Sequence, residues 1–232
     1  MVDSKKIAGF IKKKVKDAGA KGVVVGLSGG LDSAVVAKLS VKALGKDKVL
    51  GLIMPSPTTN LEDTKDAEEF ARSLGIPYKK IPLQSILEAF RAFLELDRAA
   101  YGNLMARTRM MLLYYYANLN NLLVVGTGNK SELSIGYFTK YGDGGCDILP
   151  IGDLYKTEVR ELAGKLGIPK KIIEKIPTAG LWDGQTDESD MGVTYEELDR
   201  VLSGKAKNKR VQQMVKASEH KRRMPEICKI KD

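Results

Sequence analysis

Three short apolar runs stand out along the chain: 22–27 (GVVVGL), 48–54 (KVLGLIM) and 122–126 (LLVVG). They are rich in β-branched residues and do not alternate with polar positions. Such runs are typical of strands buried on both faces of a parallel sheet. The pattern therefore predicts three central strands.

Longer segments between and after these runs carry apolar residues at helical spacing. The segment 60–74 predicts a helix in which Asn60 is the N-cap, Gly75 the C′ residue and Pro77 the stop. The segments 101–119 and 156–167 also follow the helical period. For 101–119 we expect Leu104, Thr108, Met111, Leu112 and Tyr115 to share the buried side.

Strands that alternate with helices predict an α/β protein with a doubly wound, mostly parallel sheet flanked by helices. Ligands bind such sheets beyond the carboxyl ends of the strands. The chain has 232 residues, a length that suits one large domain, and we expect residues 1–232 to form it.

Composition narrows the classes of function. A single histidine and two widely spaced cysteines argue against zinc clusters and disulfide frameworks. No apolar run is long enough for a membrane span, and the N-terminus lacks a signal-peptide pattern, so we expect a cytoplasmic protein. The net charge of +9 suits an anionic partner, but no aromatic residues alternate with the basic ones, so nucleic acid is not expected.

The first apolar run leads directly into Ser-Gly-Gly-Leu-Asp-Ser, residues 28–33. A strand that ends in glycines before a helix start offers free backbone N–H groups to a phosphate. Gly29 and Gly30 permit a tight turn and close approach, and Ser28 and Ser33 add hydroxyl donors. Asp32 beside a phosphate suggests a divalent cation such as Mg²⁺.

Two familiar phosphate motifs do not fit this stretch. A Walker A loop requires a lysine that is missing here, and the glycine spacing of the Rossmann fingerprint is different. The alternative is a purely structural role: a strand-to-helix turn in which Asp32 and Ser33 only cap the helix.

The motif S-G-G-x-D-S resembles the PP-loop of the N-type ATP pyrophosphatases. Further strings resemble the ammonia-dependent NAD synthetase family: GNLMARTRM (102–110), GTGNKSE (126–132), GYFTKYGDGGCDILPIGDLYKTEVR (136–160), PTAG (177–180) and EHKRRMP (219–225). The match runs along nearly the whole chain. The resemblance implies a Rossmann-like fold of the adenine nucleotide alpha hydrolase type.

It also implies a ligase that forms a C–N bond. In this reaction ATP and Mg²⁺ adenylate the nicotinate carboxylate of deamido-NAD, and ammonia then displaces AMP to give NAD. The substrates supply both nucleophiles, so the enzyme needs charge compensation rather than a catalytic Ser, Cys or His.

The resemblance nominates site residues. Asp32 and Glu132 would hold Mg²⁺, and together with Lys156 they would form the catalytic set. The ATP contacts would be Gly26, Leu27, Ser28, Gly29, Gly30, Leu31, Asp32, Ser33, Thr127, Lys156 and Thr178. Taken alone, Glu132 also reads as an ordinary first-turn carboxylate, and Lys156 is unfavourable at a helix start unless it faces an anion.

The residues implied for deamido-NAD are Arg107, Lys140, Asp147, His220 and Lys221. Arg109 lies two positions beyond Arg107, and we expect it to face another side of the helix. The sequence departs from the bacterial pattern at GTGNKSE and at Cys146. The resemblance also implies a homodimer.

Two rival functions stay open at this stage. One is a tRNA-modifying PP-loop enzyme, which the basic charge would suit. The other is a nucleotide-binding regulatory module without turnover, which requires that Asp32 and Glu132 lie apart.

Two loops are expected, at 139–147 and at 177–192. We hypothesise that 181–190 closes over the adenylate. From Tyr195 onward the pattern is helical and thinly apolar, which predicts an outer position.

Overall fold

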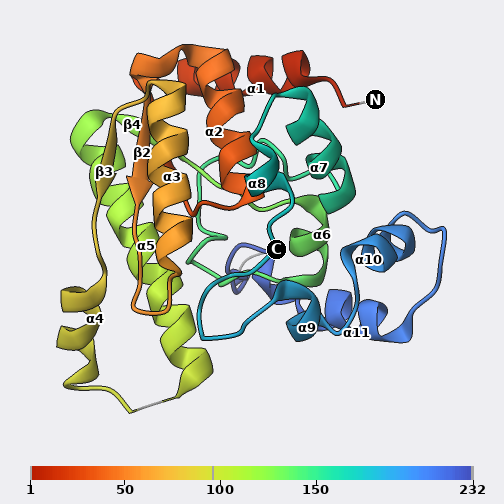
Figure 1. The fold of residues 1–232 in the computed structure, drawn as a ribbon. Coiled ribbons are helices and arrows are strands. Elements are labelled where there is room, and N and C mark those ends of the chain that lie inside the picture. The colour runs from red at the N-terminus through yellow and green to blue at the C-terminus, as the bar shows by residue number, and fades with distance from the viewer. Residues whose placement is uncertain (1, 96, 231–232) are drawn as a thin grey trace.

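The computed structural model describes residues 2–95 and 97–230 (Figure 1). Within them, parallel strands form one sheet in the order β3-β2-β1-β4. The strands are β1 (Gly22–Gly26), β2 (Val49–Ile53), β3 (Tyr78–Lys80) and β4 (Leu122–Val125). The predicted α/β fold and its three central strands are confirmed. The short edge strand β3 was not predicted, because two of its three residues are lysines.

Helices surround this sheet. They are α1 (Ser4–Asp17), α2 (Leu31–Leu44), α3 (Leu61–Leu74), α4 (Gln84–Arg91), α5 (Arg98–Asn120), α6 (Lys130–Ile135), α7 (Lys156–Lys165), α8 (Lys170–Ile173), α9 (Asp187–Met191), α10 (Tyr195–Leu202) and α11 (Lys209–Ala217). Short 3₁₀ turns lie at Lys46–Lys48 and Glu219–Lys221. None of the helices in the described ranges has the length and apolar character needed to cross a bilayer.

The two faces of the sheet pack against different helices. Val23 and Val25 of β1 belong to a core shared with α1, α2, α3, α7 and α8. Val24 points the other way, into a core shared with α4 and α5. The alternation follows from the two-residue period of a strand. It explains why the runs are apolar throughout: both faces are covered.

The predicted limits of the helix at 60–74 are confirmed. The Asn60 side chain accepts from the Glu62 N–H at 2.9 Å, and Gly75 adopts the left-handed conformation with φ of 67°. Helix α3 therefore begins and ends where its capping residues stand.

The buried side of α5 differs from the prediction. Met105, Ala106, Met110, Leu113 and Ala117 are buried, whereas two residues of the predicted face, Met111 and Tyr115, are 55% and 60% exposed. This helix has apolar residues on most of its sides, so helical spacing alone did not identify the side that packs on the sheet.

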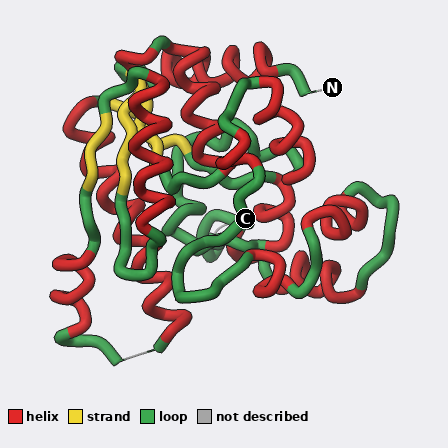
Figure 2. Tube along the Cα trace, viewed as in Figure 1, coloured by secondary structure: helices red, strands yellow, loops and turns green. Residues whose placement is uncertain are grey.

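The C-terminal helices form a small core of their own. Tyr195, Leu198 and Val211 are almost fully buried there, together with Met191. The outer position expected from Tyr195 onward is therefore wrong for this tyrosine. Figure 2 shows loops, drawn in green, gathered between the sheet and these helices. The loop expected at 177–192 also contains the short helix α9.

Candidate active site

A cavity of 880 Å³ opens at the carboxyl ends of β1, β2 and β4. Gly26, Ile53 and Val125 lie at these three strand ends and line it. The cavity continues past Lys156 and along the segment 176–185. Its position agrees with the rule that parallel α/β sheets bind ligands beyond the carboxyl ends of their strands.

The loop between β1 and α2 forms one wall of this cavity. The Ser28 and Ser33 hydroxyl oxygens lie 3.1 Å apart, and the Ser28 N–H donates to Ser33 Oγ at 3.3 Å. Gly30 is the N-cap of α2 and has no side chain to bond the first N–H groups of the helix. The helix start therefore presents backbone donors and the positive end of its dipole to the cavity.

Gly29 has a packing role in addition to its turn. Its φ is +80°, and a Cβ there would lie 2.2 Å from the Asp63 carbonyl oxygen of α3. Every other residue of the range 26–33 lines the cavity, whereas Gly29 does not. This position therefore needs glycine for the close approach of α3 as well as for the left-handed conformation.

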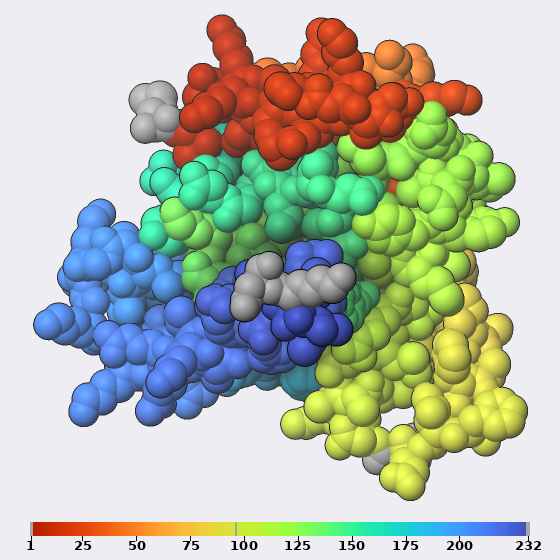
Figure 3. Space-filling model, turned by 180° about the vertical axis from the view of Figure 1, so that it is seen from behind, coloured from red at the N-terminus to blue at the C-terminus, as the bar shows by residue number. Residues whose placement is uncertain are grey.

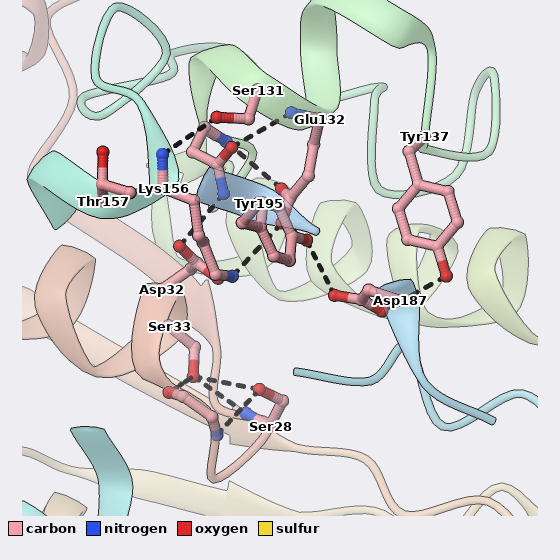
Figure 4. Close-up of polar contacts among 12 residues, drawn as sticks. Ser28, Asp32, Ser33, Ser131, Glu132, Tyr137, Lys156, Thr157, Asp187 and Tyr195 are labelled. Atoms are coloured by element: carbon pink, nitrogen blue, oxygen red, sulfur yellow. Dashed lines mark hydrogen bonds and ion pairs between the residues drawn. The ribbon is translucent and has the colours of Figure 1, made fainter. Parts of the chain in front are cut away.

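Asp32, Glu132 and Lys156 meet at the centre of the site (Figure 4). The Lys156 ammonium forms an ion pair with Asp32 and lies 3.4 Å from Glu132 Oε1. The Lys156 side chain is only 3% exposed. This lysine starts α7 and faces two anions, as its unfavourable place at a helix start indicated. The two acids are together, so the geometry required by a module without turnover is absent.

Glu132 has both of the positions that the sequence left open: it caps the start of a helix, and it faces the centre of the site. Its Oε2 accepts from the Asn129 N–H at 3.3 Å and completes a capping box at the start of α6. Its Oε1 faces Lys156. The Asn129 amide also donates to Asp32 Oδ1 at 3.2 Å, which links the two acids.

Burial shifts the pKa values of several side chains in this group. Burial raises the pKa of the Glu132 carboxyl to about 7, although Lys156 opposes the change. Burial also raises the pKa of Asp187. For Lys156, burial lowers the pKa, but Asp32 and Glu132 outweigh it, so the ammonium stays protonated. The site thus holds a fixed cation near two carboxyl groups, Glu132 and Asp187, whose ionisation burial disfavours.

Three residues of this group, Tyr195, Asp187 and Tyr137, were not predicted from the sequence. The Tyr195 hydroxyl lies 2.8 Å from Asp187 Oδ2 and 3.1 Å from Glu132 Oε1, and it can donate its proton to either. The Tyr137 hydroxyl lies 3.2 Å from Asp187 Oδ1 (Figure 4). The acidic character of the loop 181–190 was visible in the sequence, but nothing local showed that the Asp187 side chain turns inward.

Asp199 was also missed. It is 6% exposed and accepts from both the N–H and the hydroxyl of Thr157, at 3.0 and 2.8 Å. Its other oxygen accepts from the Ser131 hydroxyl, and Ser131 Oγ accepts from the Lys156 N–H at 2.9 Å. Asp199 of α10 therefore ties the start of α7, which carries Lys156, to α6, which carries Glu132.

A second group of charges lies at the rim of the cavity. Lys175 donates to the Gly29 carbonyl at 3.2 Å and to Asp63 and Asp66 at 2.6 Å each. Lys171 lies 2.6 Å from Asp66 and 2.6 Å from Glu69. These contacts attach the loop before α2 to α3 and to the segment after α8.

The predicted nucleotide contacts divide into two sets. Thr127, Thr178 and Lys221 line the cavity, as does the segment 181–185. Arg107, Lys140, Asp147 and His220 do not.

Three of the residues outside the cavity are joined to one another by hydrogen bonds near the surface. Arg107 donates to the Lys140 carbonyl at 3.3 Å, and Lys140 donates to the His220 carbonyl at 2.8 Å. The Asp147 carboxylate accepts from the Val124 N–H at 2.7 Å and from Tyr114 at 2.9 Å, so it holds its own loop against β4.

Arg109 and Arg107 face different sides of α5, as expected, but Arg109 lines the cavity and Arg107 does not, so their expected order as substrate contacts is reversed. On α5, Ala106, Arg109, Met110 and Leu113 share the side that borders the cavity. Their spacing of three and four residues places them on one face of the helix.

Comparisons with known proteins agree over nearly the whole chain. A family model described as NAD synthase matches residues 4–225. The NH(3)-dependent NAD(+) synthetase of Archaeoglobus fulgidus is 52% identical, with 98% of this chain and 96% of that protein covered.

Solved structures extend the comparison to three dimensions. NMN synthetase from Francisella tularensis superposes with a TM-score of 0.93 at 43% identity, over 97% of this chain and 96% of that one. NH3-dependent NAD synthetase from Campylobacter jejuni superposes with a TM-score of 0.81 at 38% identity, over 99% of this chain and 100% of that one. The chain belongs to the NAD synthase family.

Proposed function

We propose that this protein amidates deamido-NAD with ammonia at the expense of ATP, releasing NAD, AMP and pyrophosphate. Family membership supports the reaction. The observation that carries the proposal is the convergence of Asp32, Glu132 and Lys156 beside an uncapped helix start. This arrangement suits phosphoryl chemistry in which negative charge must be held in place.

ATP is proposed to bind with its phosphates at the start of α2. The free N–H groups of that helix and the hydroxyls of Ser28 and Ser33 would be the donors. Thr127 and Thr178 line the same cavity. The Lys156 ammonium would stabilise the charge that moves from the α-phosphate to pyrophosphate, because it is buried and already oriented.

A magnesium ion fits the residues present. Asp32 and Glu132 offer carboxylate oxygens that already converge on one cation, the Lys156 ammonium. In the described part of the chain no three His, Cys, Asp or Glu side chains form a preformed metal cluster. Mg²⁺ commonly uses one or two carboxylates plus substrate phosphates, which is the donor set expected here. When bound, it would neutralise phosphate charge.

The second step needs a water-free site. Ammonia would attack the carbonyl carbon of the adenylate, and AMP would leave. The segment 181–185 already lies over the cavity, with Leu181 N–H donating to Gln185 Oε1 at 2.7 Å and Thr58 donating to the Gly180 carbonyl at 2.9 Å. We propose that this segment shields the adenylate from hydrolysis.

The experiment is a product analysis. The protein is incubated with ATP, Mg²⁺, deamido-NAD and ammonium, and the nucleotide products are separated. AMP, pyrophosphate and NAD in equal amounts support the proposal. Formation of ADP, or turnover that requires tRNA, would overturn it.

A second candidate substrate has a specific observation behind it. The superposed structure from Francisella tularensis is named an NMN synthetase, and its TM-score of 0.93 exceeds the 0.81 of the NAD synthetase from Campylobacter jejuni. The same chemistry on nicotinate mononucleotide would give NMN. Competition between the two acids in one assay, read as the ratio of kcat/KM values, decides which substrate is preferred.

We also propose that the protein is a homodimer in which residues 1–232 act as one domain. Met111, Tyr115 and Leu119 of α5 are 55%, 60% and 65% exposed and recur every four residues. Arg107 continues the same stripe toward Lys140. An apolar helix face of this kind suits burial against a second copy.

Helix α5 (yellow-green) and the C-terminal segment (blue) both lie on the face seen in Figure 3. If the exposed stripe of α5 is the dimer interface, Arg107 lies near that interface, because it belongs to the same stripe. Light scattering of the wild type and of Leu119→Asp tests this: the wild type should have twice the mass of one chain and the variant should dissociate.

A further inference from the structure

The cavity is lined by five cationic side chains in the described residues: Arg109, Lys156, Arg160, Lys175 and Lys221. Three of them are paired with carboxylates. Lys156 contacts Asp32 and Glu132, Lys175 contacts Asp63 and Asp66, and Arg160 lies 2.7 Å from Glu196.

The other two cations have no carboxylate within 4 Å among the described residues. Lys221 uses its ammonium on two carbonyls, those of Gly136 and Phe138, both at 2.8 Å. Arg109 uses a single donor: its Nε donates to the Met54 carbonyl at 3.1 Å. In the described chain, the remaining N–H groups of Arg109 have no protein acceptor and face the cavity.

This arrangement leaves donors available to a bound ligand. Arginine carries five donors and stays charged, and among the described residues no buried side-chain nitrogen or oxygen lacks a hydrogen-bond partner, so the unpaired Arg109 donors are accessible from the cavity that this residue lines. Burial lowers the pKa of Arg109 to about 10, and Asp143 acts in the opposite direction without reaching ion-pair distance. The group is thus a cation at neutral pH with unused donors.

The surroundings of Arg109 indicate what it meets. Met54 lies just beyond β2, on the side of the phosphate-binding loop, whereas Thr139 and Asp143 belong to the segment 136–147. Arg109 therefore lies between the wall proposed for ATP and the segment 136–147, which contains Lys140 and Asp147, two of the residues that the resemblance implies for deamido-NAD. Both substrates carry oxyanions, and a guanidinium can bind a phosphate or a carboxylate through two parallel hydrogen bonds.

We propose that Arg109 binds an oxyanion of a bound nucleotide substrate, a phosphate or the nicotinate carboxylate. The inference rests on the proposed function, because it takes the substrates from it. It names Arg109, rather than the more exposed Arg107 on the same helix, as the arginine that contacts substrate inside the cavity.

The test measures equilibrium binding by calorimetry, with no turnover. Arg109→Met removes the charge at similar side-chain length. Arg109→Lys keeps the charge but loses the planar guanidinium that can form two parallel hydrogen bonds. Arg91→Met is the matched control, because Arg91 is exposed on α4 and lies outside the cavity. Each protein is titrated with ATP plus Mg²⁺, with deamido-NAD and with NAD.

We expect Arg109→Met to weaken at least one of these ligands by about 10- to 100-fold, the range for a lost charge-assisted hydrogen bond, and Arg109→Lys to fall between. A loss for ATP alone identifies an ATP phosphate. Equal losses for deamido-NAD and NAD identify a phosphate of the pyridine nucleotide. A loss for deamido-NAD but not for NAD identifies the carboxylate, which NAD lacks.

Affinities within twofold of wild type for all three ligands in Arg109→Met would overturn the proposal, and so would the same result in Arg109→Lys if Arg109→Met does not fold. Thermal unfolding establishes that the variants are folded, and Arg109→Lys serves if Arg109→Met is not. Product formation by the wild type is measured in parallel. If the wild type makes NAD while Arg109→Met binds normally, only the inference about Arg109 falls.

Discussion

Two groups of polar and charged side chains lie at or beside the same cavity, and the pKa values of their acids shift in opposite directions. The buried cluster consists of Asp32, Glu132, Lys156, Asp187 and Tyr195. The rim cluster consists of Asp63, Asp66, Glu69, Lys171 and Lys175. Both combine carboxylates with lysine ammonium groups at ion-pair distance.

The pKa values of their carboxyls diverge. In the buried cluster, burial raises the pKa of Glu132 to about 7 and raises that of Asp187. In the rim cluster, burial also pushes the pKa of Asp66 upward, but hydrogen bonds from Lys171 and Lys175 overcome it, so that its pKa lies below 3.8.

The difference lies in the number of cations per acid and in their access to water. The Lys156 ammonium contacts two carboxyl groups of the buried cluster and acts on a third, Asp187, whereas both lysines of the rim cluster contact Asp66. The buried cluster therefore has more acids per cation, and a divalent cation could hold these acids in the ionised form. At the rim, two ammonium groups keep Asp66 ionised, and Lys175 attaches the loop to α3.

The largest expected effect comes from the cation of the buried cluster. Lys156→Met should lower kcat by about 100- to 1,000-fold, because it removes a preorganised positive charge from the reaction centre. Steady-state kinetics with saturating substrates measures this. Lys209→Met, which removes an exposed lysine from the first position of α11, is the control. A loss below tenfold would mean that the buried cluster has no special role.

The next effect comes from the lysine that joins the rim cluster to the loop between β1 and α2. Lys175→Met should raise KM for ATP by about tenfold and change kcat less, since the Gly29 carbonyl loses its hydrogen bond and the loop becomes less ordered. Lys171→Met is the matched control, because Lys171 contacts Asp66 but not the loop. Equal KM values for the two variants would contradict this role.

A smaller effect concerns stability and its pH dependence. Asp66→Asn should lower the free energy of unfolding at pH 7 by about 1–3 kcal/mol, because its side chain is 5% exposed and accepts from two ammonium groups. The folded pKa lies below 3.8, so the wild type gains this stability above that value.

The same linkage gives the sign of the pH effect. As the pH falls below about 4, the Asp66 carboxylate binds a proton and its advantage over Asp66→Asn should shrink. Urea unfolding across the acid range measures both proteins, with the exposed Asp47→Asn as control. A constant difference at all pH values would show that the charge of Asp66 contributes nothing.

The smallest effect is expected at the outer edge of the rim cluster. Lys171 and Glu69 are 53% and 59% exposed. Exposed ion pairs contribute little, so Lys171→Met should shift the melting temperature by less than about 2 °C. Differential scanning calorimetry measures it. If Lys171→Met lowered the melting temperature as much as Asp66→Asn does, Lys171 would be the main stabilising partner of Asp66.

Several local features of this protein, such as helix ends and the turn before α2, could be predicted from its sequence. Asn60 and Gly75 mark the ends of α3, and the Ser-Gly-Gly-x-Asp-Ser turn marks the start of α2, because such features depend on neighbours a few residues away. The pairing of Asp32 with Glu132 and Lys156 followed from the resemblance rather than from spacing.

Other features depended on packing that no local pattern records. Helix α5 is apolar on several sides, and only its contact with the sheet decides that Arg109 borders the cavity and Arg107 does not. The edge strand β3 forms because β2 offers it a partner, despite its lysines.

The sequence by itself determined the ends of α3 and the approximate positions of the central strands, and it predicted a phosphate-binding turn, since these features follow from backbone preferences of adjacent residues. Only the tertiary structure decided that Tyr195 reaches Glu132 across 63 positions and that Asp199 holds the start of α7 across 42. Such contacts arise when whole helices pack, because the burial of apolar faces fixes where their polar side chains meet.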